Sequence, residues 1–217
     1  MDEYANELRQ LEALAAAGDA DAQYAVGWLY WNGRGVEQND EVAVGWFRRS
    51  AEQGNSTAQF CLGIAYDLGR GVPYDLSAAI EWYERAARQG EAAAQLNLGK
   101  TLAEQLGRVQ EGVQWLTRAA ERGDANAQFA LGSILAAANE RVSGYPTDYG
   151  TAREWFMRAA EQRHSGGAYA LGWLYWEGLG VAADMEAARQ WWRRAAELGN
   201  AQAREALEHS SNSSQAP

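Results

Sequence analysis

The sequence of 217 residues contains one cysteine, Cys61, three prolines and two histidines. A single cysteine excludes an internal disulfide framework and fits a reducing compartment. The scarcity of proline excludes collagen-like and proline-rich chains. No apolar run approaches the roughly 20 residues of a membrane-spanning helix, so we expect no membrane insertion. The N-terminus is acidic where a signal peptide would be basic, which predicts a cytoplasmic location, or a periplasmic one only if a leader has been removed.

Positive charge is also scarce, with 19 Lys and Arg against 29 Asp and Glu and a formal net charge of −10. An acidic chain is repelled by phosphate backbones and by anionic lipid, so nucleic acid is not an expected partner. A protein partner with basic residues would suit this charge, chiefly through faster encounter. Apolar residues at 47% and charged residues at 22% are ordinary for a folded protein and exclude gross disorder.

Residues that commonly carry catalysis or bind metals are few. The histidines, His164 and His209, do not form a His-x-x-x-His pattern, and there is no Cys-x-x-Cys, so neither a zinc site nor another cofactor is expected. Cys61 lies between Phe60 and Leu62, a position typical of a small buried apolar residue, and no oriented base can be assigned to it. The sequence therefore predicts a protein that is not an enzyme.

An internal repeat is the dominant feature of the sequence. A pattern of alanine, glutamine, an aromatic residue, any residue, an aliphatic residue and glycine begins at Ala22 and at Ala58. It returns at Ala127, and with variations at Ala94 and Gly167, so that the steps along the chain are 36, 36, 33 and 40 residues. A second series, always 12 residues before the next copy of the pattern, consists of Trp46, Trp82, Trp115, Trp155 and Trp191.

Each repeat is predicted to be a pair of helices. The first helix ends at a Gly-x-Gly turn, as at Gly33-Arg34-Gly35, because glycine readily supplies the positive φ that closes a helix. The second begins after a capping Asn or Asp seven residues before its tryptophan, as at Asn39. Glycines inside the first helices each cost about 1 kcal/mol against alanine, so we expect close backbone approach there, with Trp and Tyr rings filling the remaining gaps. These glycines are Gly27, Gly63, Gly99, Gly132 and Gly172.

The predicted fold is an all-α solenoid, because a lone helical pair cannot bury its own apolar face and neighbouring repeats must stack. We expect an N-terminal capping helix in 1–19, repeats in 20–200, a C-terminal capping helix in 201–208 and a disordered tail in 209–217. Trp192 is expected to pack against the C-terminal cap. The five predicted repeats are 20–56, 57–92, 93–125, 126–165 and 166–200.

These units resemble Sel1-like repeats, which are relatives of the tetratricopeptide repeat. The resemblance rests on the pattern Ala-Gln-x-x-Leu-Gly-x-x-Tyr-x-x-Gly-x-Gly-Val, followed by Asp and Trp and then by Ala-Ala-x-x-Gly, over roughly residues 20–208. It implies a right-handed superhelix with the first helices lining its concave face, used as an adaptor surface. Sel1 proteins linked with β-lactam binding carry a cysteine pair in each repeat, which this chain lacks, so that function is not transferred.

Candidate binding residues are placed by analogy with the ligand-facing positions of tetratricopeptide repeats, around each mid-helix glycine. Trp28 and Trp31 in the first copy are spaced i, i+3, so their rings lie on one helical face. Trp173 and Trp176 repeat this spacing in the fifth copy. Tryptophan is enriched in binding hot spots, so these rings are predicted to anchor a partner segment, with internal packing as the alternative. The other predicted groove residues are Asp67, Lys100 and Glu104, which would set the register, and Tyr24, Phe60, Ile64, Ser133 and Tyr169.

The fourth copy is four residues longer, through the segment 139–149. Insertions in solenoids lie in loops along one edge, which is often a binding edge. Arg141, Tyr145 and Tyr149 are therefore candidate partner contacts, and a tolerated insertion is the alternative.

The predicted function is a non-catalytic adaptor that binds a protein or peptide in its concave groove. Two alternatives stay open. The first is an immunity protein that neutralises a bacterial toxin, a role that the resemblance brings with it. The second is a signalling scaffold that binds a small ligand or a peptidoglycan fragment, which would require a deep closed pocket. The sequence names neither the partner nor the oligomeric state.

Overall fold

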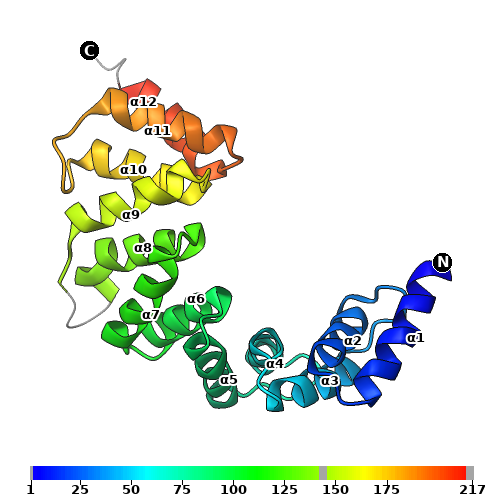
Figure 1. The fold of residues 1–217 in the computed structure, drawn as a ribbon. Helices are drawn as coiled ribbons and strands as arrows, with labels where there is room; N and C mark the ends of the chain where they lie inside the picture. Colours follow the sequence, from blue (N-terminus) through cyan, green and yellow to red (C-terminus); the bar gives the residue numbers. More distant parts are fainter. Residues whose placement is uncertain (1, 142–145, 214–217) are drawn as a thin grey trace. The chain divides into compact units, whose positions relative to one another are not determined.

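The computed structural model describes residues 2–141 and 146–213, and the side chains of residues 8–137 and 146–210. Every regular element within these ranges is a helix, as predicted (Figure 1). None of the described helices is long and apolar enough to cross a membrane. The elements are α1 (Asp2–Ala16), α2 (Ala20–Asn32), α3 (Asp40–Glu52), α4 (Ser56–Leu68), α5 (Leu76–Arg88), α6 (Ala92–Lys100), the π-helix η1 (Thr101–Gln105), α7 (Val109–Glu121), α8 (Ala125–Arg141), α9 (Tyr149–Glu161), α10 (Ser165–Glu177), α11 (Met185–Glu197) and α12 (Ala201–Ser213).

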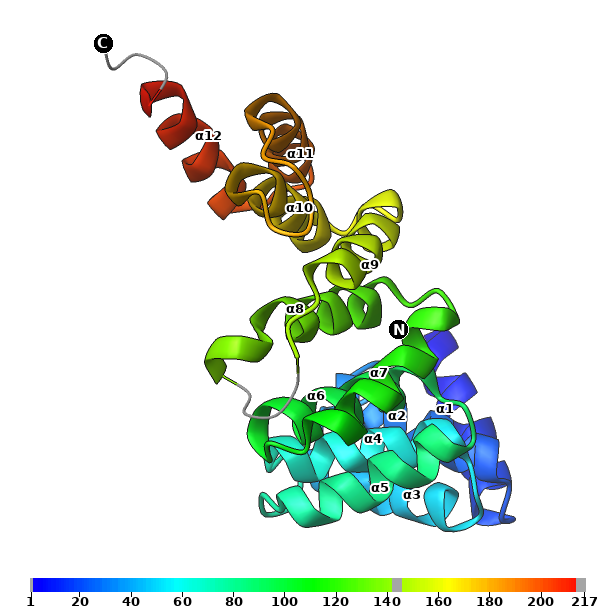
Figure 2. The ribbon, with the colours of Figure 1, turned by 90° about the vertical axis from the view of Figure 1, so that its left-hand side faces the viewer.

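The helices form two compact units, residues 1–98 and residues 99–217. In the N-terminal unit α2 packs on α3 and α4 packs on α5. In the C-terminal unit α8 packs on α9, α10 packs on α11, and α12 follows against α11. These pairs can be followed in Figures 1 and 2. The predicted solenoid of helical pairs is therefore confirmed.

The helix ends lie where the capping residues of the sequence place them. The side chains of Asn39, Asp75 and Asp184 accept hydrogen bonds from backbone N–H groups in the first turns of α3, α5 and α11. Gly33 closes α2 with φ of 65°, and Gly178 closes α10 with φ of 71°. These helix ends are thus determined locally, by residues that the sequence alone identifies.

Close contact between paired helices explains the glycines inside the first helices. A Cβ at Gly27 would lie 2.7 Å from the Phe47 ring, and one at Gly63 would lie 2.5 Å from the Tyr83 ring. The ring or side chain that fills each gap belongs to the residue after the repeated tryptophan, not to the tryptophan itself. The five contacts are Gly27 with Phe47, Gly63 with Tyr83, Gly99 with Leu116, Gly132 with Phe156 and Gly172 with Trp192.

Trp192 has this role in the fifth repeat, which the sequence had not assigned to it. It fills the space next to Gly172 inside the fifth repeat and is 2% exposed, so it belongs to the core of that repeat, and its packing against the C-terminal cap stays a prediction. The physical reason is its place in the repeat, because it follows Trp191 as Phe47 follows Trp46.

The repeated tryptophans lie beside arginines three positions further along the same helix. The guanidinium carbon of Arg49 lies 4.6 Å from the centre of the Trp46 ring, which is cation–π geometry. The same pairing recurs in the other four copies, between Trp82 and Arg85, Trp115 and Arg118, Trp155 and Arg158, and Trp191 and Arg194.

A buried glutamine ties each of the first four copies to the helix before it. The Gln23 side-chain amide donates to the carbonyl oxygen of Ala15 at 3.0 Å, which satisfies a carbonyl at the end of α1. Ala168 stands at this place in the fifth copy, and Arg194 donates to the Ala160 carbonyl instead, also at 3.0 Å. The equivalent glutamine bonds join Gln59 to Ala51, Gln95 to Ala87 and Gln128 to Ala120.

The C-terminal helix is longer than predicted. α12 continues to Ser213, so the predictions of a cap ending at residue 208 and of a disordered tail are wrong for residues 209–213. Ser210 is buried, and Arg189 of α11 donates to its backbone oxygen at 2.7 Å, which holds this end of the helix in place. Residues 214–217 lie outside the described part of the chain.

The copies of unusual length differ at the end of their first helix. The third copy, which lacks the Gly-x-Gly turn, ends its first helix in the π-helix Thr101–Gln105. The fourth copy uses part of its insertion to lengthen α8 to Arg141. The insertion had suggested a loop over residues 139–149, but residues 139–141 are helical.

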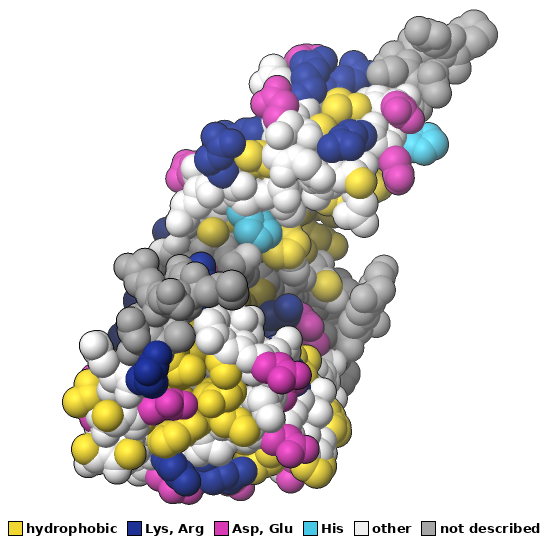
Figure 3. All heavy atoms as spheres, turned by 90° about the vertical axis from the view of Figure 1, so that its right-hand side faces the viewer, with side chains coloured by type: hydrophobic (Ala, Val, Ile, Leu, Met, Phe, Trp, Pro, Cys, Tyr) yellow, Lys and Arg dark blue, Asp and Glu magenta, His cyan; other side chains and the backbone are white. Residues whose placement is uncertain are grey.

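The N-terminal cap α1 packs on the first repeat. Leu8 and Ala15 are buried in one cluster with Val26 and Leu29 of α2. Leu14 on α1 is nevertheless 53% exposed. Figure 3 shows apolar side chains gathered over the N-terminal unit, among acidic and basic ones. The cap therefore covers the first repeat without having a wholly polar outer face.

Candidate functional site

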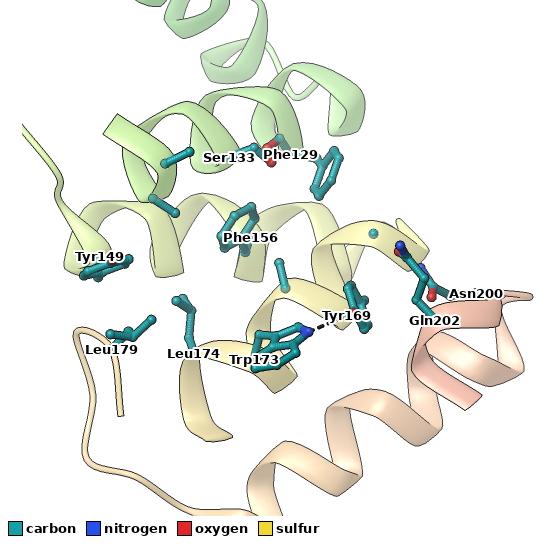
Figure 4. Close-up of a pocket in the computed structure, with 14 residues that line it drawn as sticks. Phe129, Ser133, Tyr149, Phe156, Tyr169, Trp173, Leu174, Leu179, Asn200 and Gln202 are labelled. Carbon is teal, nitrogen blue, oxygen red and sulfur yellow. Dashed lines mark hydrogen bonds between the residues drawn. The ribbon is translucent and has the colours of Figure 1, made fainter. Parts of the chain in front are cut away.

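A partly open pocket of about 640 Å³ lies in the C-terminal unit (Figure 4). Its walls come from α8, α9 and α10, from the turn after α10 and from the start of α12. Its volume falls in the range of about 300–1,000 Å³ that is usual for ligand sites. Five aromatic side chains line it, namely Phe129, Tyr149, Phe156, Tyr169 and Trp173.

The junction between the first and second copies corresponds to this pocket in the repeat pattern, but there the space is filled by side chains. The Trp31 ring packs on Phe47, with ring centres 5.8 Å apart, and the guanidinium carbon of Arg70 lies 3.7 Å from the Trp31 ring centre. Arg70 also donates to the Trp31 carbonyl oxygen at 2.6 Å and forms an ion pair with Asp40 at 2.7 Å. A Cβ on the neighbouring Gly71 would collide with the Asp40 backbone. The Trp31 ring therefore already packs against other side chains of the protein.

Between the fourth and fifth copies, Ala136, Tyr149 and Leu179 stand where the junction of the first two copies has Trp31, Asp40 and Arg70. The correspondence is supported by geometry, because a Cβ at Gly180 would lie 2.7 Å from the Tyr149 backbone, as expected for the equivalent of the collision at Gly71. Alanine in place of tryptophan leaves space, and leucine in place of arginine leaves that space uncharged. The pocket is thus a repeat junction from which the tryptophan and its ion pair are missing.

Trp173 is the most exposed of the five aromatic side chains, at 41%. Its indole Nε1 donates to the Tyr169 hydroxyl at 2.7 Å, and its ring meets Trp192 edge-on with the centres 6.1 Å apart. The Tyr169 oxygen accepts this bond, so its own hydroxyl proton can be donated to another group. The indole is held in place while a large part of it faces solvent.

None of the described residues that line the pocket carries a charge. The Ser133 hydroxyl donates to the Phe129 carbonyl at 2.9 Å. Asn200 uses its side-chain oxygen to cap α12, accepting from the Ala203 N–H at 2.9 Å, and Gln202 lies in the first turn of that helix. The pocket therefore combines apolar walls with neutral hydroxyl and amide groups.

His164 packs against Phe129, one of the rings that line the pocket. Its ring stacks on Phe129 with centres 4.7 Å apart, and its Nδ1 accepts a hydrogen bond from the Gly167 N–H at 3.0 Å, which caps α10. Burial lowers the pKa of His164, although the nearby Asp124 carboxylate opposes this shift. The neutral imidazole is the form that caps α10, because a protonated Nδ1 cannot accept.

Four predicted binding residues meet in this pocket, namely Ser133, Tyr149, Tyr169 and Trp173. Asn200 and Gln202 were not among the predicted binding residues, because one ends the fifth repeat and the other lies in the C-terminal helix, whereas the candidates were sought on the first helices of the repeats and in the insertion. The available signal was the small Ala136 at the position of Trp31, which indicates space at that junction.

Two predicted groove residues of the N-terminal unit belong to the packing between paired helices. Tyr24 lies 6.1 Å from Phe47, and Phe60 lies 5.9 Å from Tyr83, measured between ring centres. These rings pack on the same side chains that fill the gaps at the mid-helix glycines, so they stabilise the repeats.

The tryptophan pairs do not form equivalent anchors. Trp28 is half-buried, with the Arg34 guanidinium carbon 5.6 Å from its ring centre. Trp176 is also half-buried, and its ring centre lies 5.5 Å from that of Trp192. Of the four predicted anchors, Trp173 alone is exposed. A groove running through all five copies stays a prediction.

The predicted register-setting residues have different environments. Asp67 accepts a hydrogen bond from the Tyr83 hydroxyl at 3.1 Å, and burial together with this carboxylate raises the pKa of Tyr83. Lys100 is exposed at the end of α6, Glu104 is exposed in η1, and Ile64 is half-buried on α4. Their role in setting the register of a partner stays a prediction.

The insertion contributes one described candidate. Tyr149 is half-buried, begins α9 and lines the pocket. Arg141 is the last residue of α8, but its side chain lies outside the described residues, as does all of Tyr145.

Cys61 does not have the environment of a nucleophile. It is partly buried, and burial raises the pKa of its thiol to about 12, with a smaller contribution from Glu91. The thiolate is the reactive form and is scarce at neutral pH. Among the described residues, no three His, Cys, Asp or Glu side chains are grouped so that they could hold a metal ion.

Comparison with solved structures shows the fold in other proteins. A Sel1 repeat protein from Oxalobacter formigenes is 32% identical, with a TM-score of 0.84 over 95% of this chain and 82% of that one. A protective antigen of uropathogenic Escherichia coli is 30% identical, with a TM-score of 0.51 over 94% of this chain and 51% of that one. An immunity protein from Pseudomonas aeruginosa is 16% identical, with a TM-score of 0.55 over 90% and 74%, which shows the fold alone.

Comparison with curated proteins gives no match. The family model for the Sel1 repeat matches residues 20–55, 56–91, 92–124, 125–164 and 165–200. Each of these boundaries lies within one residue of the repeat boundary expected from the sequence pattern. Five consecutive matches cover most of the chain, and the Oxalobacter Sel1 repeat protein is similar in both sequence and fold. The chain therefore belongs to the Sel1-repeat family.

Proposed function

We propose that this chain is a non-catalytic protein-binding module and that the pocket between its fourth and fifth repeats is the binding surface. Sel1 repeat proteins generally mediate protein–protein interactions. The observation that carries the proposal is Trp173, whose ring is 41% exposed at an uncharged aromatic pocket. Burying such a ring contributes a large apolar area at low entropic cost, which is why tryptophan dominates many interfaces.

The first repeat is a weaker candidate for the same role. Trp31 already contacts Phe47 and Arg70, so a partner would have to displace contacts that the chain makes with itself. Trp173 contacts Tyr169 and Trp192 but stays 41% exposed, so a partner would cover this exposed surface without displacing those neighbours. Comparing the effects on partner binding of substitutions at the pocket and in the N-terminal unit therefore tests the proposal.

The test is a pull-down from the source organism with the wild type, Trp173→Ala, Ala137→Glu and Leu68→Glu. Trp173→Ala removes the exposed ring, and Ala137→Glu adds a carboxylate at an exposed residue of the pocket wall. Leu68→Glu is the control, because Leu68 is 66% exposed on α4 in the other unit. Circular dichroism establishes that each variant stays helical.

We expect one partner to be retained by the wild type and by Leu68→Glu, and to be lost from both pocket variants. Loss of a hot-spot tryptophan costs at least about 2 kcal/mol, which weakens binding about 30-fold. A partner that binds all four proteins equally would show that the pocket is not the binding surface.

A toxin-neutralising role is the main alternative. Immunity proteins of Pseudomonas aeruginosa share the fold at 16% and 20% identity, which is support from fold alone. Under this alternative the captured partner is a toxic effector, and co-expression of the chain protects cells from it. The alternative of a small-ligand scaffold is less favoured, because the pocket is partly open. The proposed location is the cytoplasm, which cell fractionation would test.

A further inference from the structure

The chemistry of the pocket also indicates what kind of segment it takes. We propose that it binds an uncharged, apolar segment of a partner protein, with Asn200 and Gln202 pairing with a main-chain amide of that segment. This inference rests on the proposed function and adds the chemical class of the partner. It differs from the basic partner that the overall charge of the sequence suggests.

The first argument is the absence of charge among the described lining residues. A charged side chain that entered the pocket would lose hydration and find no opposite charge, which costs several kcal/mol. At the corresponding junction of the first two copies, Asp40 and Arg70 supply both signs of charge. Tyr149 and Leu179 replace them here, so this junction favours apolar groups.

The second argument is the arrangement of the walls. Figure 4 shows Tyr149 and Leu179 at one end of the view and Asn200 with Gln202 at the other, with Trp173 between them. An apolar side chain of the partner can therefore contact Trp173 and Leu179 while the backbone of the partner reaches the side-chain amides at the other end. Side-chain amides both donate and accept, which matches a peptide group and does not require a charge.

The third argument is where the acidic excess lies. Residues 1–98 carry 7 Lys and Arg against 15 Asp and Glu, whereas residues 99–217 carry 12 against 14. The unit that contains the pocket is thus nearly neutral. It would neither attract a basic segment strongly nor repel a neutral one.

The experiment uses the full chain as bait for a phage-displayed library of random dodecapeptides. Enriched peptides are synthesised and titrated by fluorescence anisotropy against the wild type and Trp173→Ala. They are also titrated against Asn200→Asp and Gln202→Glu. Aspartate keeps the cap of α12 because it accepts as asparagine does, but it removes the amide donor and adds charge. Asn126→Asp is the control, because Asn126 is exposed in the first turn of α8 and does not line the pocket.

We expect peptides whose binding is lost in Trp173→Ala to share a run of uncharged residues around an apolar side chain. Replacing that side chain by Asp or by Lys should weaken binding at least about tenfold. Asn200→Asp and Gln202→Glu should each weaken it several-fold, and Asn126→Asp should not.

The inference is overturned if the peptides that depend on Trp173 require a charged residue, if no peptide depends on Trp173, or if both amide variants bind as tightly as the wild type. The pull-down separates this failure from that of the proposed function. A partner lost with Trp173→Ala in the pull-down keeps the pocket as the binding surface even when the segment proves to be charged.

Discussion

Replacing Gly63 by alanine is expected to destabilise the protein, although alanine is the better helix former. The added Cβ would lie 2.5 and 2.6 Å from two ring carbons of Tyr83, well inside normal carbon contact distances of about 3.5–4.0 Å. Tyr83 is fully buried and donates to Asp67, so its ring cannot move freely. Overpacking of this kind costs about 1–3 kcal/mol.

Two further contributions set the net change. Alanine gains about 1 kcal/mol of helix propensity over glycine. A shift of the Tyr83 ring would weaken its bond to the half-buried Asp67 carboxylate, and bonds to charged groups contribute about 1.5–3 kcal/mol. We therefore expect the free energy of unfolding to fall by about 1–3 kcal/mol in Gly63→Ala.

Gly45→Ala is the matched control in the same unit. Gly45 lies inside α3, is exposed, and a Cβ there would meet nothing within 4 Å. This substitution should therefore raise the free energy of unfolding by about 0.5–1 kcal/mol. Urea unfolding followed by far-ultraviolet circular dichroism measures both variants. A Gly63→Ala protein as stable as the wild type would refute the claim that close helix approach requires this glycine.

Three other outcomes follow from the structure. Arg70→Met should lower the free energy of unfolding by up to about 1 kcal/mol, a small effect because the lost ion pair with Asp40 is partly exposed. It should also increase the exposure of Trp31, because the guanidinium group over that ring is removed. Urea unfolding measures the first effect and acrylamide quenching of tryptophan fluorescence the second, and unchanged quenching would contradict the second. Because burial lowers the pKa of His164 in the folded protein, the stability that it provides is present above the unfolded pKa of about 6.5 and is lost as the pH falls below that value. His164→Asn should remove this dependence in thermal melts between about pH 6.5 and 5.5, since asparagine caps helices without titrating. Native Cys61, with its pKa raised to about 12, should react with iodoacetamide at pH 8 at least about 100-fold more slowly than in urea, and equal rates would contradict its burial.

Features that depend on neighbours in sequence could be predicted from the sequence. Asn39 caps α3 and Gly33 closes α2 as expected, because a cap needs only the backbone groups of the adjacent turn. The spacing of the repeats likewise indicated paired helices, since a period of this length matches one supersecondary unit. The length of α12 could not be predicted in this way, because its last turns are held by Arg189 of another helix.

The candidate site was only partly predictable. Trp28 and Trp173 occupy matching positions of the repeats, as do Trp31 and Trp176, and the sequence made all four candidates because both copies read Trp-Leu-Tyr-Trp. Their surroundings differ, since Arg70 from the next repeat contacts Trp31 and the half-buried Trp28 packs against a core cluster that reaches into the second repeat, whereas Trp173 keeps an exposed face. Local spacing places a side chain on one face of a helix, but the residues that another repeat brings against that face decide whether it is buried.

The sequence by itself thus determined the helices, the ends that Asn, Asp and Gly residues cap and the grouping into five repeats, because these follow from contacts within a few turns of the chain. The tertiary structure alone decided where a pocket opens. Ala136, Leu179 and Asn200 are far apart in sequence and are brought to one cavity only when α8, α10 and α12 pack in succession. The size of such a space depends on side-chain volumes summed over several helices, which no single repeat encodes.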